Sequence, residues 1–398
     1  MTPEVIVVSA SARALVRSAR RAGWCAAAID AFGDVDTRAQ AERWRRLPAD
    51  GDGRIDSRAL LAVLDAIAPE GTAVIIGSGL EAAPDAVDTI AARYELAGNG
   101  AAVWRRVGDA RDWFDLLERL GIPHPEVRWS VPRDPAGWLC KRAASSGGRG
   151  VRTAADADRI NTAGDGGYFQ RRVEGLVASL LFLADGGQAR CIGFNRLLAA
   201  PAAAANPFAW GGAVRPAALA PDLQAQVGDA ATALTRALDL RGLNGLDFVV
   251  AGRAWHLLEL NPRPTATVEL WDVDPMPPLL DLHLRACRGA ALDGPAIAAG
   301  GRAMAAQALA VAVAYAPAAL RVPRDPCWPD ACRDLPRPGS RLRAGDPLCT
   351  VHAAAATAAG AARRVLALRD TVPDALLRAA AGTARRAARR PAPAEAAA

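Results

Sequence analysis

Residues 244–264 read NGLDFVVAGRAWHLLELNPRP, and this stretch decides the fold of the middle of the chain. A glycine turn separates two apolar runs, a pattern that predicts a β-hairpin. If Asp247 pairs near Leu257, period-two alternation places three polar side chains on one face, namely Asp247, Glu259 and Asn261. Two carboxylates and an amide oxygen suit Mg²⁺ held against nucleotide phosphates. A hairpin whose acids face only water is the alternative, but the mixed polar face of ELNPRP favours the metal site.

Upstream of the hairpin, the segment CKRAASSGGRG (residues 140–150) contains Lys141, the only lysine of the chain. Lys141 ends a predicted strand and precedes a glycine-rich loop, in which backbone N–H groups can approach an anion closely. Every other basic side chain apart from histidine is arginine, so this site retains a compact ammonium that fits beside phosphate as a point charge. The lysine precedes the glycines, so the segment is not a Walker loop. A flexible hairpin turn beside a surface lysine is the alternative.

The order of predicted elements divides the chain into an α/β part, an α+β part and a β-rich part. Residues 1–95 alternate strands and helices, which predicts a parallel α/β domain. Residues 96–295 begin with one long helix ending near Gly121, followed by short strands and a helix between Pro221 and Leu240. Residues 296–380 read as a small β-rich domain and residues 381–398 as a disordered Ala/Arg tail.

Composition excludes several classes of protein. The chain has 398 residues, 51% of them hydrophobic and 23% charged, which is typical of a globular protein. Its seven cysteines include no Cys-x-x-Cys pair, and no signal peptide or apolar membrane span is apparent, so we expect a cytoplasmic protein away from membranes. The net charge of +6 includes four arginines after Thr383, and no basic stripe with interleaved aromatic residues favours nucleic-acid binding.

Taken together, CKRAASSGGRG, the QRRVEG segment at residues 170–175 and the acidic hairpin resemble the ATP-grasp superfamily over about residues 103–270, in the order that this family has them. The resemblance implies a Rossmann-like α/β domain before a two-lobed ATP-grasp domain. The whole sequence looks like the predicted ATP-dependent carboligases of this superfamily, some of which accompany tetrahydromethanopterin-type C1 cofactor genes.

The resemblance also implies roles for individual residues. Lys141 matches the lysine that contacts nucleotide phosphates, and the loop that would close over them comprises Ser145, Ser146, Gly147, Gly148, Arg149 and Gly150. The linker facing adenine would comprise Gln170, Arg171, Arg172 and Val173. Asp247, Glu259 and Asn261 match the magnesium ligands. Arg263 matches the arginine that faces the acyl or carboxy phosphate in carbamoyl phosphate synthetase and biotin carboxylase. Ala110 departs from the family pattern, since many members carry a basic residue there; Arg106 and Arg111 are the candidate substitutes.

The activity implied is that of an ADP-forming ligase that uses ATP and Mg²⁺ (or Mn²⁺). Lys141 and Arg263 would be its catalytic cations, and its substrates would be a small-molecule carboxylate and an amine. ATP-dependent carboxylation or phosphorylation of a small molecule is one alternative, and a nucleotide-binding protein without turnover is another, supported by Ala110. A homodimer is the default expectation for such an enzyme.

Overall fold

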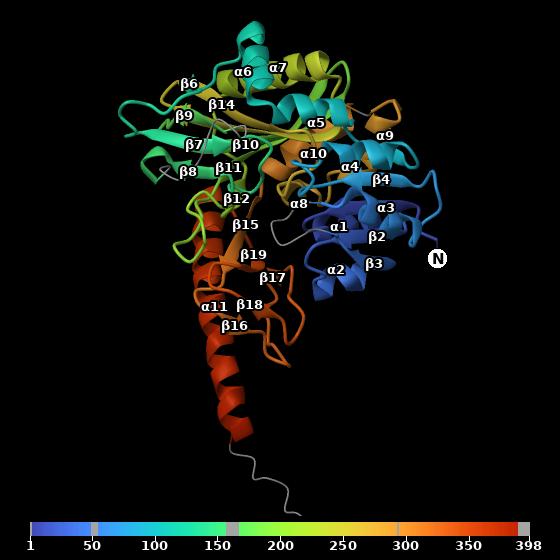
Figure 1. Cartoon of the computed structure of the whole chain (residues 1–398), viewed down its shortest axis with the longest axis vertical. Helices are drawn as coiled ribbons and strands as arrows, with labels where there is room; N and C mark the ends of the chain where they lie inside the picture. Colours follow the sequence, from blue (N-terminus) through green and yellow to red (C-terminus); the bar gives the residue numbers. More distant parts are fainter. Residues whose placement is uncertain (1, 49–54, 157–166, 293, 389–398) are drawn as a thin grey trace, which may run out of the picture.

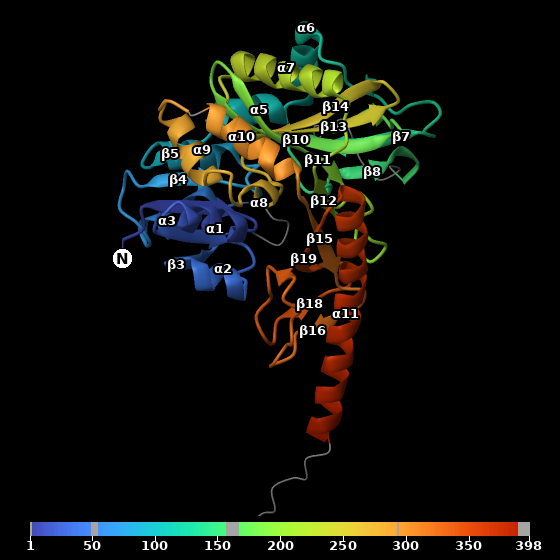
Figure 2. The same ribbon diagram turned by 180° about the vertical axis from the view of Figure 1, so that it is seen from behind.

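The computed structural model describes residues 2–48, 55–156, 167–292 and 294–388. The amino-terminal unit lies beside the middle part of the chain, and a long carboxy-terminal helix runs away from both (Figures 1 and 2). This mixture of a parallel α/β unit, antiparallel lobes and a small carboxy-terminal portion is the fold class that the sequence predicts. Within the described ranges, no helix has both the length and the apolar character needed to cross a membrane.

The amino-terminal unit is a parallel five-stranded sheet in the order β3-β2-β1-β4-β5. Its strands are β1 (Val5–Ser9), β2 (Ala26–Asp30), β3 (Arg43–Arg46), β4 (Ala73–Ile76) and β5 (Glu95–Ala97). The helices between them are α1 (Arg13–Arg21), α2 (Val35–Gln40), α3 (Ser57–Asp65) and α4 (Pro84–Ala91). Every residue of β1 and β4 is buried, as expected for central strands of a sheet covered on both faces.

Two helices precede the first lobe of the middle domain, where the sequence predicts one. They are α5 (Ala101–Gly108) and α6 (Ala110–Leu120). The break lies at Asp109, whose carboxylate accepts hydrogen bonds from the backbone N–H groups of Arg111 and Asp112 and so caps α6. Gly121 ends α6 with a φ of 64°, which a glycine adopts without strain.

The first lobe is a four-stranded sheet in the order β6-β9-β7-β8. Its strands are β6 (Val127–Arg128), β7 (Trp138–Arg142), β8 (Val151–Thr153) and β9 (Gly167–Arg171), and a 3₁₀ turn, η1 (Ala154–Asp156), follows β8. Lys141 pairs with Tyr168 across β7 and β9, and Leu139 pairs with Gln170. Lys141, Tyr168 and Gln170 therefore share one face of this sheet.

The second lobe is built on an antiparallel eight-stranded sheet in the order β14-β13-β10-β11-β12-β15-β19-β17. Its strands are β10 (Leu176–Asp185), β11 (Ala189–Leu197), β12 (Gly212–Arg215), β13 (Arg241–Ala251), β14 (Ala254–Asn261), β15 (Ala308–Tyr315), β17 (Cys332–Arg333) and β19 (Pro347–Ala355). The associated helices are α7 (Pro221–Leu238), α8 (Val268–Trp271), α9 (Leu279–Cys287) and α10 (Gly294–Ala305). The hairpin expected within residues 244–264 is β13 and β14.

The carboxy-terminal residues depart from the sequence prediction in two ways. Strands β15, β19 and β17 extend the eight-stranded sheet from β12, and only β16 (Leu320–Arg321) and β18 (Arg341–Leu342) form a separate small sheet. Helix α11 (Ala358–Ala388) occupies residues 358–380, the last part of the predicted β-rich domain, and the first eight positions of the predicted disordered tail. Alanine and arginine are strong helix formers, and the buried Val365 and Val372 pack the helix against the sheet. Residues 389–398 lie outside the described residues.

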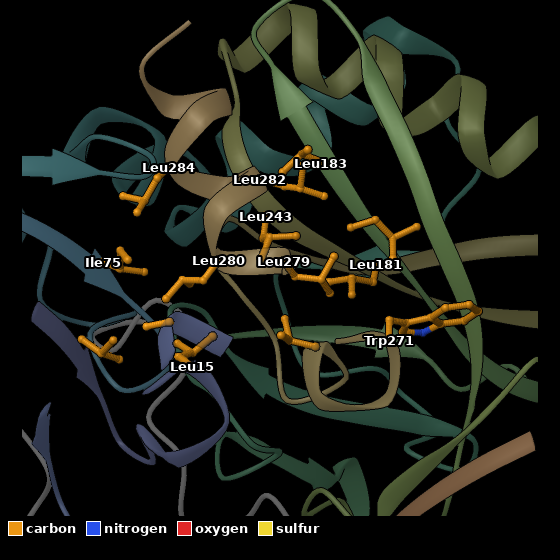
Figure 3. Close-up of a cluster of buried hydrophobic side chains, with 14 of the residues drawn as sticks. Leu15, Ile75, Leu181, Leu183, Leu243, Trp271, Leu279, Leu280, Leu282 and Leu284 are labelled. Atoms are coloured by element: carbon orange, nitrogen blue, oxygen red, sulfur yellow. The ribbon is translucent and has the colours of Figure 1, made fainter. Parts of the chain in front are cut away.

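An apolar core joins the amino-terminal unit to the second lobe. Leucines of α9, among them Leu279 and Leu280, lie between Leu15 and Ile75 on one side and Leu181 and Trp271 on the other; Figure 3 shows this cluster. Because one continuous core crosses the boundary, the two parts are held at a fixed relative position.

Charged side chains are also buried where the amino-terminal unit meets the carboxy-terminal strands. Arg13 donates to Glu269 and, from Nε at 2.8 Å, to Asp334. Burial would lower the pKa of Arg13, but the two carboxylates raise it instead. Asp34 lies in the same region and is 6% exposed. Burial, with Asp334, Asp30 and Asp36 nearby, raises the pKa of Asp34 to about 8.

Candidate active site

Lys141 lies on β7 with its ammonium among polar side chains of β9. Its Nζ donates to Oε1 of Gln170 at 3.0 Å. Tyr168 lies directly opposite in the sheet, and burial raises the pKa of its hydroxyl, opposed by the nearby Lys141 ammonium. Gln170 is 1% exposed, and its Nε2 has no hydrogen-bond partner among the residues that the structure describes. A buried donor without a partner is costly unless a ligand supplies an acceptor, so this face is suited to an anionic or heterocyclic ligand.

The glycine-rich loop forms the turn between β7 and β8, where the sequence predicts it. Gly147 and Gly148 have φ values of 62° and 74°. Gly148 also lies against the segment after β11, because a Cβ there would lie 1.7 Å from the carbonyl oxygen of Phe208. Nδ2 of Asn206 donates to the carbonyl oxygens of Gly148, at 2.8 Å, and Val151, at 3.3 Å. Asn206, which the sequence analysis did not identify, thus holds the loop.

The segment from Gln170 to Val173 leads from β9 in the first lobe towards β10 in the second, the position predicted for the linker. The guanidinium of Arg171 lies over the ring of Trp138, and Arg172 pairs with Glu174 at 2.9 Å. None of these linker residues lines the cleft described below. Among the described contacts of these four linker residues, one joins the linker to another predicted site residue: Gln170 accepts the hydrogen bond from Lys141.

The three predicted metal ligands are together at one end of the β13–β14 hairpin. Asp247 pairs with Glu259 rather than near Leu257, because a bulge between Asp247 and Phe248 shifts the register. Nδ2 of Asn261 donates to Oδ2 of Asp247 and to Oε1 of Glu259, both at 3.3 Å. The bulge places the carboxylates of Asp247 and Glu259 opposite each other, whereas a register that pairs Asp247 near Leu257 would not.

These side chains fit a divalent cation. Burial and the adjacent Glu259 raise the pKa of Asp247 well above its ordinary value, the effect expected of two carboxylates that share a site without an intervening positive charge. Oxygen donors from two carboxylates and one amide match the preference of Mg²⁺, which keeps several waters and takes few protein ligands. No group of three His, Cys, Asp or Glu side chains placed to hold a metal occurs in the described ranges. The candidate metal site consists of two carboxylates and the amide of Asn261.

Arg263 connects this site to the amino-terminal unit. Its Nε donates to Oε1 of Glu81 at 2.7 Å, and its Nη2 donates to Oδ1 of Asn261 at 3.0 Å. Oε2 of Glu81 in turn accepts from the backbone N–H of Gly79, in the turn after β4. Glu81 is the partner that orients Arg263, and it also lines the cleft described below.

One cleft brings the two motifs together. Its lining includes Lys141, Ser145 and Gly148 from the first lobe and Glu259 and Asn261 from the hairpin. Tyr168, Glu81 and Arg142 also line it. The phosphate-binding and metal-binding candidates therefore face a common space.

The cation that the family pattern places at position 110 is not supplied by either candidate substitute. Ala110 lines the cleft, whereas Arg106 donates to the carbonyl oxygen of Ala237 and Arg111 lies over the ring of Trp129, with neither in the lining. Arg142, next to Lys141, does line the cleft.

Residues 107–267 match the family model of the ATP-grasp domain. The chain contains an ATP-grasp domain. The matched residues include Lys141, the glycine-rich loop, the three candidate metal ligands and Arg263. No curated protein sequence matches the chain significantly.

Solved structures share the fold of this chain over nearly its whole length. The biotin carboxylase of Campylobacter jejuni, in complex with β-γ-ATP, has a TM-score of 0.69 at 15% identity, covering 91% of this chain and 90% of that one. The biotin carboxylase domain dimer of Hydrogenobacter thermophilus 2-oxoglutarate carboxylase, with MgADP, ADP and bicarbonate, has a TM-score of 0.67 at 14% identity and coverages of 92% and 90%. The N5-carboxyaminoimidazole synthase of Aspergillus clavatus, with ADP and 5-aminoimidazole ribonucleotide, has a TM-score of 0.67 at 15% identity and coverages of 93% and 98%. The nucleotides and magnesium named in these structures agree with the cofactors that the sequence predicts, ATP and Mg²⁺.

Proposed function

We propose that the protein is an ADP-forming ligase that activates a small-molecule carboxylate as an acyl phosphate for attack by an amine. The observation that carries this proposal is the shared cleft, in which Lys141 and the glycine-rich loop face the Glu259 and Asn261 end of the hairpin. A nucleotide whose phosphates contact Lys141 places its γ-phosphoryl near the candidate metal ligands. Activity as a homodimer is part of the proposal.

The chemistry divides into two steps. An oxygen of the substrate carboxylate attacks the γ-phosphorus of ATP, and the bond to the β–γ bridging oxygen breaks, which releases ADP. The amine nitrogen then attacks the acyl carbon to form a tetrahedral centre, which expels inorganic phosphate and loses a proton to leave an amide. Both steps build negative charge on oxygen, so catalysis depends mainly on positioning and charge neutralisation.

The residues of the chain supply these two effects. Lys141 and the loop N–H groups would bind the phosphates, with Asn206 holding the loop in place. Asp247, Glu259 and Asn261 would hold Mg²⁺, which neutralises phosphate charge when bound. Arg263, already oriented by Glu81, would stabilise the charge on the transferred phosphoryl group or the tetrahedral centre.

The proposal is tested first by isothermal titration of the purified chain with a nonhydrolysable ATP analogue, with and without Mg²⁺. We expect binding that depends on magnesium and is lost in Lys141→Ala but retained in Arg119→Ala, an exposed arginine of α6 that serves as the control. Screening carboxylate and amine pairs for ADP release then identifies the substrates. Absence of nucleotide binding in the wild-type chain would contradict the proposal.

A second candidate function is carboxylation, in which bicarbonate is the activated carboxylate. The similarity of the fold to two biotin carboxylase structures, one of them with bicarbonate bound, favours it. ADP release that requires bicarbonate, with ¹⁴C-bicarbonate carbon retained in the product, would support carboxylation. Release that requires another carboxylate and forms an amide would support the ligase.

A further inference from the structure

A second pocket lies between helix α2 and the carboxy-terminal segment around β16 and β18, and it shares no lining residue with the active-site cleft. Its lining contains three arginines, namely Arg38 of α2, Arg321 of β16 and Arg337 before β18. Val35, Pro338, Gly339 and Ser340 complete the lining, which contains no acidic side chain. Positively charged side chains from the amino-terminal unit and from the carboxy-terminal segment therefore line the same pocket.

None of these three guanidinium groups forms an ion pair with a carboxylate among the described residues. Some other exposed arginines of the chain do, as Arg105 does with Asp85 and Asp88. Three like charges lining one concavity repel one another, and this repulsion costs stability unless an anion offsets it. A group of unpaired arginines in a concavity therefore indicates a binding site more than a solvated surface.

Two of the arginines are held in defined orientations. The guanidinium of Arg38 lies 4.7 Å from the ring centre of Trp44, and Nε1 of Trp44 donates to the buried carboxylate of Asp30 at 2.6 Å. Nε of Arg321 donates to the carbonyl oxygen of Gly339 at 3.2 Å. Because neighbouring groups already restrict these side chains, less entropy is lost when they bind a ligand.

The two sides of the pocket are also fixed relative to each other. The backbone N–H of Val35 donates to the carbonyl oxygen of Leu335 at 2.8 Å. The carboxylate of Asp36 accepts from the backbone N–H groups of Asp334, at 2.8 Å, and Leu335, at 3.0 Å. The helix that carries Arg38 is therefore joined to the segment that precedes Arg337, and the arginines keep their spacing.

We propose that this pocket binds the phosphate group of a small molecule. Guanidinium groups form paired charge-assisted hydrogen bonds with phosphate oxygens, and a phosphate offers enough oxygens for three arginines at once. Ser340 adds a hydroxyl to the lining. The site is separate from the nucleotide cleft and its existence does not depend on the proposed ligase activity.

The test is isothermal titration of the full chain with inorganic pyrophosphate, in EDTA and at constant ionic strength. The Lys141→Ala background removes the lysine of the nucleotide cleft, and binding that remains there and is weakened by Arg321→Ala or Arg337→Ala reports the second pocket. We expect one pyrophosphate per chain in this background, bound about tenfold or more weakly when Arg321→Ala or Arg337→Ala is added. Arg58→Ala, an exposed arginine of α3, is the matched control and should leave the affinity unchanged. Circular dichroism confirms that each variant is folded.

Three results would overturn the proposal. They are absence of binding in the Lys141→Ala background, equal weakening by Arg58→Ala, and binding of citrate as tight as that of pyrophosphate, which would contradict the preference for phosphate. Nucleotide binding by the wild-type chain is measured separately, so failure of this site and failure of the proposed ligase function give different results.

Discussion

The side chain of Glu259 is exposed and lines the cleft, whereas that of its partner Asp247 is half-buried and is not part of the lining. Glu259→Gln keeps the size of the side chain and removes its charge, so metal binding should weaken while the fold remains. We expect turnover to fall by about 10² or more. ADP release measured beside Glu118→Gln, an exposed glutamate of α6, checks this. Near-normal turnover in Glu259→Gln would remove Glu259 from the metal site.

Asp34 gives a pH dependence of stability whose sign follows from its pKa. The carboxyl group has a pKa of about 8 in the folded chain, against about 3.9 when unfolded. Between these values the folded state keeps a proton that the unfolded state has lost, so the contribution of Asp34 to stability falls as pH rises from about 4 to about 8. The side chain of asparagine does not ionise, so the stability of Asp34→Asn relative to that of the wild type should increase as pH rises.

Thermal unfolding of both proteins at pH 5 and pH 8 measures this effect. We expect the Tm of Asp34→Asn minus the Tm of the wild type to be more positive at pH 8 than at pH 5. An equal difference at both pH values would show that Asp34 ionises in the folded chain as it does in the unfolded one.

The sequence indicated the roles of some site residues and gave no indication of others. Lys141 stood out because the chain has no other lysine, and the hairpin pattern placed Asp247, Glu259 and Asn261 on one face. Asn206 gave no signal, because a lone asparagine in an alanine-rich loop has no periodicity or spacing that could connect it to Gly148. Its role depends on a contact between segments far apart in the chain.

The turn between β7 and β8 allows a comparison of two neighbouring glycines. Alanine at position 147 or 148 must adopt a positive φ and incurs a similar backbone cost. Only Gly148→Ala also places a Cβ against the carbonyl of Phe208, since nothing lies within 4 Å of the corresponding position at Gly147. We expect Gly148→Ala to weaken binding of the ATP analogue several-fold more than Gly147→Ala does.

Titration of both variants with the analogue and Mg²⁺ measures this difference, and Asn206→Ala is expected to act in the same direction as Gly148→Ala. Equal affinities in the two glycine variants would mean that the contact with the segment after β11 does not position the loop for nucleotide binding.

Elements with strong local signals were predicted well, and those set by a single side chain or by distant pairing were not. The buried runs of β1 and β4 and the helix α7 agree with the sequence, since apolar periodicity is local. The helix break at Asp109 depends on one capping carboxylate, and the bulge after Asp247 changes a register that alternation alone cannot fix. Helix α11 was missed because residues 358–380 were assigned to the predicted β-rich domain and the Ala/Arg composition after residue 380 also suits a solvated tail.

At the scale of the whole molecule, the buried group of Arg13, Glu269 and Asp334 connects three parts of the chain. Arg13→Met would leave two buried carboxylates without their cation. We expect a loss of about 3–5 kcal/mol in the free energy of unfolding. Urea denaturation beside Arg20→Ala, an exposed arginine of the same helix, measures it. A loss no greater than that of the control would mean that the carboxylates find other partners.

The overall architecture could be predicted from the order of motifs, whereas the contacts between its parts could not. The sequence indicated a parallel unit, a two-lobed middle and a strand-rich end. It did not reveal that β15 pairs with β12, because the two strands are about a hundred residues apart and neither pattern specifies a partner. Glu81 and Arg263, which are 182 residues apart in the sequence, meet only in the folded chain.

The pairing of β12 with β15 also has a consequence for synthesis on the ribosome. Until residues 308–315 leave the exit tunnel, the edge of β12 that β15 will cover presents unpaired backbone groups, which are a template for pairing with another nascent chain. The nucleotide cleft can thus form before the sheet beside it is complete. A translational pause just after the hairpin would then lengthen the interval in which aggregation competes with folding.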